Sequence, residues 1–372
     1  MDLSDSCPPL FIVGLGRSGS TLVSRMIDAH PAAAIFPETH MFGVLEFVGA
    51  LENFGDRWQY VLFLNEVWAN LAAYPDAAAD VWANHAASQP DYTGPTQNLL
   101  NEIGQRYATA RNARFWGEKT PGHALWLGNI RMLFPEAKII FTIRDPRDVL
   151  VSYCERWNRG RFDPGFVMES AANIRYHLTR LLQSPAFPAE KIHWVRYESL
   201  TADPEREMHQ ICRFLQIDFV PEVLSFFQKH GNVENETPDG VHHKLLSRPV
   251  TRERVGVFRK TFSPSLLNLI ETFLSGEMAA LGYSAEAPAG LPHSSEEEKA
   301  KIRALRCYAD ITNGKVRQKQ RLRMQQKIWV YRHFNRLLAT IPAKKLAMSS
   351  EHWRQRAASL KLRSNAVRAG SG

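Results

Sequence analysis

The chain has 372 residues, a formal net charge of +8 at pH 7 and 44% hydrophobic residues, which is enough to build a sizeable α/β core. No segment approaches about 18 consecutive apolar residues, and the first residues have neither a basic region nor a long apolar run, so we expect neither a transmembrane helix nor a signal peptide. The four cysteines are far apart and form no C-x-x-C pair, so we expect no zinc site, no disulfide framework and a reducing, cytoplasmic compartment.

The first predicted element is a strand, followed by a glycine-rich loop and a helix. Leu10 to Val13 is an apolar run of strand length, and apolar residues recur with helical spacing over 22–27. The loop between them holds three glycines, one arginine and three hydroxyl residues: Gly14, Gly16, Gly19, Arg17, Ser18, Ser20 and Thr21. Glycines let a backbone approach a ligand closely, and the free N–H groups of a first helical turn bind anions. The segment therefore predicts an anion-binding cradle.

This loop departs from the Walker loop, G-x-x-x-x-G-K-[ST], of nucleotide hydrolases. Gly14 and Gly19 have the Walker spacing, but Ser20 stands where the lysine belongs, and the basic residue comes earlier, as Arg17. A magnesium-dependent nucleotide hydrolase depends on that lysine. The loop therefore predicts a phosphate-bearing donor that is handled without the lysine and without a metal. The alternative is a tight turn that binds no ligand.

A second informative segment spans residues 137–153. Residues 139–143 are β-branched or aromatic, as is typical of a buried strand, and the following Asp145 is placed to cap a helix that begins at a proline. Arg144 ends the strand, and Ser152 follows eight residues later, about two helical turns on. Both can reach a single phosphate, for which a bidentate guanidinium is the usual partner.

Together these segments resemble the sulfotransferase superfamily, whose members transfer a sulfuryl group from 3′-phosphoadenosine 5′-phosphosulfate (PAPS). The stretch 16–21 is similar to the family's 5′-phosphosulfate loop, and Arg144 with Ser152 is similar to its 3′-phosphate motif. The resemblance covers residues 8–283 and implies an α/β fold, with a P-loop-like parallel sheet of about five strands flanked by helices. It implies PAPS as the co-substrate, with adenosine 3′,5′-bisphosphate as its product, and no metal. The donor contacts that it implies are Arg17, Ser18, Gly19, Ser20, Thr21, Arg144 and Ser152.

Further motifs resemble the branch that contains the tyrosylprotein and bacterial sulfotransferases. Asp-Ala-His-Pro at 28–31 is followed by a Glu-Thr pair whose glutamate, Glu38, the resemblance makes the catalytic base. Lys119 stands in the Lys-Thr-Pro context that this branch places near the sulfuryl group. Tyr197 lies in an Arg-Tyr-Glu-Ser-Leu signature whose tyrosine contacts the nucleotide. The tyrosylprotein enzymes carry an arginine two residues after the glutamate, where this chain has His40, so the resemblance does not extend to a tyrosylprotein acceptor.

Sulfuryl transfer needs a base for the acceptor hydroxyl and cations at the leaving oxygen. Glu38 is the candidate base, and Lys119 and Arg17 are the candidate cations at the phosphate–sulfate bridge. Each position has a structural alternative: Glu38 as the cap of a helix, Lys119 as a surface lysine before a turn, and Tyr197 as packing on a strand. His40 is a loop histidine that either supplements Glu38 or takes no part in the chemistry.

A third basic segment, residues 245–260, is similar to the patch that closes over the 3′-phosphate in this family. Arg252 and Arg259 are its predicted donor contacts, with Arg254 and Lys260 as further candidates. A loop that closes here over the donor would exclude water as a lid does. The alternative is a solvated basic loop without a ligand.

The end of the chain differs in composition from the rest. Residues 301–372 hold 18 Lys or Arg against two acidic residues, and they follow a segment rich in Ala, Pro and Ser. The predicted organisation is a donor-binding domain over 8–283, a linker over 284–298 and a basic helical tail over 299–372. The amphipathic run 328–338 suits an anionic membrane surface or an acidic partner, whereas nothing resembles a nucleic-acid recognition module. The alternative is a helical extension packed on the domain.

The sequence thus predicts a PAPS-dependent sulfotransferase that acts on a hydroxyl or amine acceptor: a carbohydrate, a glycolipid or other lipid-linked group, or a small molecule. The expected location is cytoplasmic, with peripheral membrane contact of the tail as one arrangement. Two alternatives remain. One is a P-loop kinase of a small molecule, which magnesium dependence would distinguish, and the other is a non-catalytic scaffold that binds a partner through its basic tail.

Overall fold

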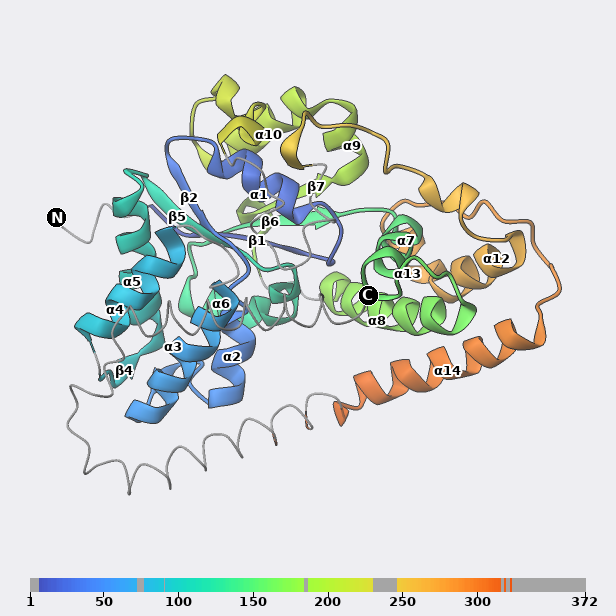
Figure 1. Cartoon of the computed structure of the whole chain (residues 1–372), viewed down its shortest axis with the longest axis horizontal. Coiled ribbons are helices and arrows are strands. Elements are labelled where there is room, and N and C mark those ends of the chain that lie inside the picture. Colours follow the sequence, from blue (N-terminus) through green and yellow to red (C-terminus); the bar gives the residue numbers. More distant parts are fainter. Residues whose placement is uncertain are drawn as a thin grey trace, which may run out of the picture.

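The computed structural model describes residues 7–71, 77–89, 91–183, 187–229 and 246–315, together with Gln318 and Leu322. A parallel five-stranded sheet lies at the centre, with helices on both faces (Figure 1). Its strands, in their order across the sheet, are β2 (Ala33–Phe36), β5 (Phe115–Lys119), β1 (Leu10–Gly14), β6 (Lys138–Ile143) and β7 (Ile192–Arg196). The predicted fold class is confirmed. Because β1 lies between β5 and β6, the segments that follow these three strands emerge side by side.

The sheet is buried on both faces because alternate side chains of its strands enter two separate cores. In β1, Phe11 and Val13 join the larger core, whereas Leu10 and Ile12 join the smaller one. The larger core is covered by α2 (Met41–Val48), α3 (Arg57–Leu71), α4 (Ala77–Ser88), α5 (Thr96–Ala110), α6 (Leu127–Leu133), α7 (Pro146–Trp157), α8 (Pro164–Leu182), α12 (Pro264–Phe273), α13 (Ser275–Ala280) and α14 (Ser295–Thr312). The smaller core is covered by α1 (Ser20–Asp28), α9 (Tyr197–Ala202), α10 (Pro204–Leu215) and α11 (Phe226–Lys229).

Short elements complete the described part of the chain. An antiparallel pair joins β3 (Asn53–Phe54) to β4 (Gly94–Pro95) beside the helices that cover the larger core. Four 3-10 helices stand in connections: η2 (Pro121–Trp126), η3 (Ala189–Lys191), η4 (Pro221–Val223) and η7 (Val257–Lys260). In the described ranges, no helix is both long and apolar enough to cross a bilayer.

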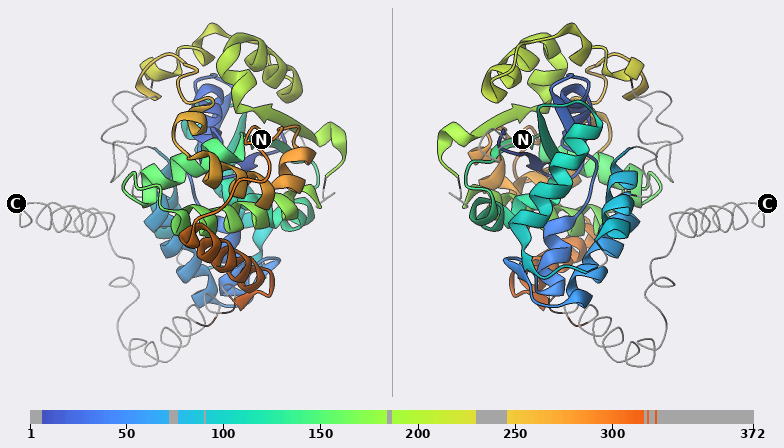
Figure 2. Two further views of the ribbon diagram at one scale, coloured as in Figure 1. Left: turned by 90° about the vertical axis from the view of Figure 1, so that its right-hand side faces the viewer. Right: turned by 90° about the vertical axis from the view of Figure 1, so that its left-hand side faces the viewer.

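Helix α14 packs along α8 (Figures 1 and 2). In sequence it comes long after β7, the last strand of the sheet. A capping box at Ser294 and Glu297 starts the helix, and the Ser265 hydroxyl donates to Glu297 Oε1 at 2.8 Å. Ala300 and Ala304 are buried in the larger core. Of the predicted basic tail, the described residues are 299–315 with two single residues beyond, and the amphipathic run 328–338 lies outside them.

Candidate active site

The glycine loop turns the chain from β1 into α1 at the carboxyl end of the sheet. Gly14 and Gly19 have positive φ angles of 146° and 93°, and Arg17, which carries a side chain, has a φ of 67°. A positive φ is uncommon for a non-glycine residue and is found where the surrounding structure enforces it. Gly19 caps α1 without a side-chain hydrogen bond, so the N–H groups of the first helical turn have no capping side chain. This geometry suits an anion.

Two aromatic side chains explain why glycine stands at two positions of the loop. A Cβ atom at position 19 would lie 2.6 Å from the ring of Tyr197, and one at position 16 would lie 3.2 Å from the Tyr153 hydroxyl. Burial raises the pKa of Tyr153 to about 12, so its hydroxyl stays neutral above the loop. The loop is therefore held between one tyrosine from α7 and one from the start of α9.

The two predicted anion motifs are in direct contact. Arg17 Nε donates to Ser152 Oγ at 2.9 Å, and Arg144 Nη1 donates to the carbonyl of Arg17 at 3.2 Å. They meet because β1 and β6 are parallel neighbours, whose following segments leave the sheet at the same edge. Burial, followed by the nearby charges of Arg144 and Arg156, lowers the pKa of Arg17. The crowding of guanidinium groups here favours the binding of an anion.

Arg144 is buried and held from three sides. Its guanidinium lies 4.5 Å above the centre of the Tyr197 ring, its Nη2 donates to the carbonyl of Arg254, and it is 3.8 Å from the carboxylate of Asp148. Its Nε is buried and has no hydrogen-bond partner among the described residues. A buried N–H without a partner is costly, so an oxygen of a bound anion would stabilise this arrangement.

Glu38 and Lys119 form an ion pair beside the glycine loop. Lys119, the last residue of β5, places its Nζ 2.6 Å from Glu38 Oε1 and 3.3 Å from Thr21 Oγ1. The Lys119 side chain is 4% exposed and that of Glu38 31% exposed. Burial raises the pKa of Glu38, but Lys119 and His40 more than offset this effect and hold the pKa well below its usual range. The carboxylate is therefore ionised and faces partly outward.

A buried network around Glu118 was not predicted from the sequence. Glu118 accepts the backbone N–H of Thr39 at 3.1 Å, the hydroxyl of Thr39 at 2.8 Å and the hydroxyl of Thr120. His123 Nδ1 lies 2.9 Å from the other carboxylate oxygen. Burial raises the pKa of Glu118, but His123 and the hydroxyl donors lower it by a larger amount. The pKa of Glu118 therefore lies below its ordinary value. The network ties the loop that carries Glu38 to the strand that carries Lys119. A glutamate that directly follows the apolar and small residues 115–117 of a strand is the signal that could have found it.

The hydroxyl residues of the glycine loop have different surroundings. Ser18 is buried, donates to the carbonyl of Leu15 at 2.6 Å and shares a 2.7 Å hydrogen bond with Thr142 Oγ1, so its side chain stabilises the loop itself. Ser20 is buried in the first turn of α1, and Thr21 lies beside Lys119. The structure thus places Thr21 next to the ion pair and Ser18 beneath the loop.

The basic segment 246–260 contacts the site at Arg254, which the sequence offered only as a further candidate. The backbone of Arg254 contacts Arg144, while its side chain pairs with Glu155 of α7. Asp148 fixes this segment, since its carboxylate accepts the N–H groups of residues 256 and 258 at 2.7 and 3.1 Å. Arg252 is exposed, and Arg259 forms two 2.6 Å hydrogen bonds with Glu286. Leu245 lies outside the described residues.

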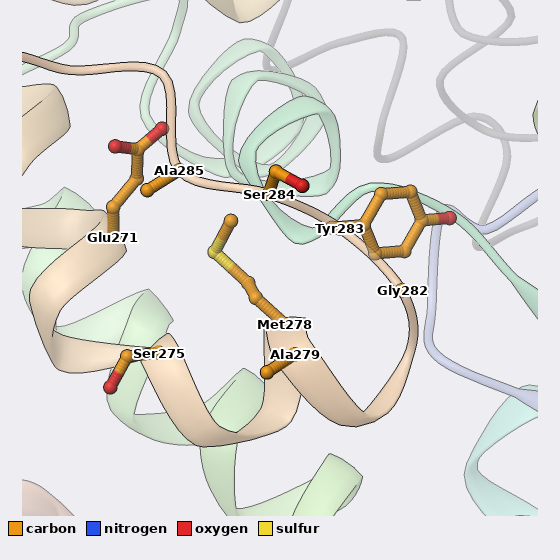
Figure 3. Close-up of a pocket in the computed structure, with 8 residues that line it drawn as sticks. All are labelled: Glu271, Ser275, Met278, Ala279, Gly282, Tyr283, Ser284 and Ala285. Atoms are coloured by element: carbon orange, nitrogen blue, oxygen red, sulfur yellow. The ribbon is translucent and has the colours of Figure 1, made fainter.

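A separate pocket lies between α12, α13 and the segment that follows them (Figure 3). Both oxygens of Glu271 in its wall accept hydrogen bonds, from Arg147 and from the N–H groups of residues 286 and 287. The remaining lining is largely small or apolar: Ser275, Met278, Ala279, Gly282, Tyr283, Ser284 and Ala285. The pocket contains none of the predicted site residues.

The fold is that of an α/β protein with a glycine loop and a cluster of buried basic side chains at the carboxyl end of its central strands. A family model described as "Sulfotransferase family" matches residues 8–221, which is more than half of the chain. The chain therefore belongs to the sulfotransferase family of PAPS-dependent enzymes, as its motifs predicted.

Individual relatives support this assignment at low identity. A putative protein-tyrosine sulfotransferase of Caenorhabditis briggsae is 29% identical over 235 residues, which are 60% of this chain and 70% of that protein. Protein-tyrosine sulfotransferase 1 of Danio rerio is 24% identical over 224 residues, 58% of this chain and 55% of that protein. The sulfotransferase domain from the Synechococcus PCC 7002 olefin synthase has the same fold, with a TM-score of 0.56 at 20% identity over 76% of this chain and 97% of that domain.

Proposed function

We propose that this chain transfers a sulfuryl group from PAPS to a hydroxyl or amine acceptor by in-line displacement. The observation that carries the proposal is the convergence of four charged residues from the ends of four neighbouring strands at one glycine loop: Arg17, Glu38, Lys119 and Arg144. None of these contacts is local in sequence, and together they provide the groups that the reaction requires.

The donor-binding roles follow from the contacts. Arg144, with its unsatisfied buried Nε, and Ser152 bind the 3′-phosphate, while Tyr197 packs against both Gly19 and Arg144 and supports the nucleotide. The N–H groups of Gly19, Ser20 and Thr21 and the side chain of Arg17 bind the 5′-phosphosulfate. Ser18 contributes by holding the loop rather than by direct contact. Arg254, whose backbone contacts Arg144, is proposed to contact the 3′-phosphate in place of Arg259. Arg252 remains a proposed contact of the donor.

The transfer roles fall to the ion pair. Glu38 accepts the proton of the acceptor hydroxyl as the acceptor oxygen attacks sulfur, and the bond from sulfur to the bridging oxygen breaks with its electron pair on that oxygen. Lys119 and Arg17 neutralise the charge that develops there. In the structure Lys119 is held by Glu38 at 2.6 Å, so donor binding must redirect its ammonium group towards the bridging oxygen.

The acceptor that we propose is a carbohydrate, a lipid-linked group or a small molecule. The two relatives from Caenorhabditis briggsae and Danio rerio are named for protein tyrosine, but His40 stands where an arginine would contact an acidic peptide. A cytoplasmic enzyme whose basic tail contacts an anionic membrane or an acidic partner fits the charge of +16 that residues 301–372 carry, from 18 basic and two acidic residues.

The test is calorimetric titration of the full chain with adenosine 3′,5′-bisphosphate, and separately with ATP and magnesium. Micromolar binding of the bisphosphate, without binding of ATP, supports the donor site if Arg144→Ala weakens it at least tenfold. Arg106→Ala, at an exposed position of α5, is the matched control and should bind as the wild type does. Transfer of ³⁵S from labelled PAPS is then measured on a panel containing an oligosaccharide, a glycolipid, a phenol and a tyrosine peptide. Tight ATP binding without bisphosphate binding would overturn the proposal in favour of a kinase.

A further inference from the structure

We propose that His40 is the proton exit of the site: it takes from Glu38 the proton that the acceptor releases and passes it to water. This inference rests on the proposed sulfuryl transfer and adds a residue that the family resemblance did not assign to the chemistry. His40 acts through Glu38 and does not touch the reacting atoms.

Glu38 and His40 lie next to each other, and His40 is the more exposed of the two. Glu38 has two carboxylate oxygens with different neighbours: Lys119 Nζ lies 2.6 Å from Oε1, and His40 Nε2 lies 3.5 Å from Oε2. The exposed fraction of the side chain rises from 4% at Lys119 to 31% at Glu38 and 54% at His40. Catalytic contacts are often long without substrate and shorten when it binds, so 3.5 Å is within reach of a proton transfer.

The backbone holds the imidazole where it is. His40 has a φ of 55°, in the left-handed region, and its N–H donates to the Thr120 hydroxyl at 3.2 Å. The preceding residue, Thr39, is fixed by Glu118 and by Asn70, whose side chain donates to the Thr39 carbonyl at 2.8 Å. A side-chain-bearing residue keeps such a conformation only where its surroundings determine it, and such positions cluster at functional sites.

The chemistry requires a destination for the proton. Each turnover converts the acceptor O–H into an O–S bond and releases one proton, which Glu38 receives. Lys119 foremost, with His40 beside it, holds the pKa of Glu38 below its usual range, so the protonated carboxyl is short-lived and an acceptor bound against it limits access of water. Imidazole is the side chain suited to accept and release a proton near neutral pH. The other ionisable groups of the adjoining network, Glu118 and His123, are paired with each other and buried.

The test compares His40→Asn and His40→Gly with the wild type. Asparagine and glycine both tolerate a positive φ, so each variant keeps the backbone while losing the imidazole. His209→Asn, an exposed histidine of α10 that stacks on Phe219, is the matched control. For each protein, affinity for adenosine 3′,5′-bisphosphate is measured by calorimetry, and kcat is measured from pH 5 to 9 with ³⁵S-labelled PAPS and the best acceptor of the panel.

We expect both His40 variants to bind the bisphosphate as the wild type does and to lose about 10- to 100-fold in kcat, at or below the lower end of general acid–base effects. Wild-type kcat should fall towards low pH, and this acid limb should be absent in His40→Asn, which lacks the imidazole. Added imidazole should restore part of the activity of His40→Gly.

The outcomes separate the two proposals. Bisphosphate binding and turnover with an unchanged pH profile in His40→Asn would overturn the proton exit and leave the sulfotransferase proposal standing. A lower kcat that keeps the acid limb and does not respond to imidazole would also overturn it, because that result indicates a structural role only. A wild type that binds no bisphosphate, or that binds it but sulfates no acceptor of the panel, would overturn the proposed function and the proton exit with it.

Discussion

The side chains of Arg17 and Ser152 are joined by a 2.9 Å hydrogen bond across 135 residues of sequence. Arg17 belongs to the glycine loop after β1, and Ser152 lies on the second half of α7, which follows β6. The loop proposed to receive the 5′-phosphosulfate and the helix proposed to receive the 3′-phosphate are therefore joined directly by these two side chains. Occupation of one end of the donor site should affect the other through this bond.

Ser152→Ala should weaken binding of adenosine 3′,5′-bisphosphate about fivefold, because a hydrogen bond of this kind contributes about 1 kcal/mol. Calorimetry on Ser152→Ala, Arg17→Ala and the double variant measures the coupling between the two side chains. We expect the double variant to lose less affinity than the two single losses combined, since either change breaks the same bond. Simple additivity would contradict a linked loop and helix.

Glu38→Gln should lower kcat by about 10²- to 10⁴-fold, the range typical of a positioned base, because the amide cannot accept the acceptor proton. Affinity for the bisphosphate product should be retained, since Glu38 is assigned to the acceptor side. Glu102→Gln, a part-exposed residue of α5 that pairs with Arg106, serves as the control. A variant that keeps its turnover would remove Glu38 from the chemistry.

Gly19→Ala should weaken donor binding by displacing Tyr197. A Cβ atom at this position would approach the ring to 2.6 Å in a backbone conformation with a φ of 93°. Because Tyr197 also packs against Arg144, the change reaches the proposed 3′-phosphate contact. Gly276→Ala is the matched control, since an added Cβ there meets nothing within 4 Å. Equal bisphosphate affinity of both variants would argue against the close packing of Tyr197 on the loop.

Glu118→Gln should lower the free energy of unfolding by about 2 kcal/mol at pH 7, the scale of a hydrogen bond to a charged group. The pKa of Glu118 in the folded protein lies below its ordinary value of 4.5, so the carboxylate stabilises the fold above that value. This contribution is lost as the pH falls below it. Urea unfolding at pH 7 and pH 4 should therefore show a smaller difference between wild type and variant at pH 4. A difference that is constant with pH would contradict the ionic role.

Much of the site was predictable because it follows from strand order and local pattern. Arg144 and the glycine loop each end a recognisable buried strand, and parallel strands bring such ends together. The side chains that the sequence did not place depend on contacts made elsewhere in the fold. Arg259 and Arg254 look alike in a basic segment, yet Glu286 pairs with the first while Asp148 fixes the backbone around the second. No local sequence pattern shows which carboxylate lies next to each of these arginines in the fold.

Glu118 shows the same limit for a buried polar residue. It follows the apolar and small residues 115–117 of its strand, and its partners come from a loop 79 residues earlier, from Thr120 and from η2. Its burial is tolerated because three hydrogen bonds reach Oε1 and His123 lies beside Oε2. The sequence contains all of these residues, but it does not show that the fold brings them together.

Helix α14 has a consequence for the smallest piece of this chain that folds alone. Ala300 and Ala304 complete the larger core against α8, and the Ser265–Glu297 hydrogen bond joins α14 to α12. A chain cut after Tyr283 would expose that face of α8 to water, although both anion motifs would remain. A stable fragment should extend to Thr312, about ninety residues past the end of the matched family region at residue 221. Limited proteolysis of the intact chain should accordingly leave a core that retains α14.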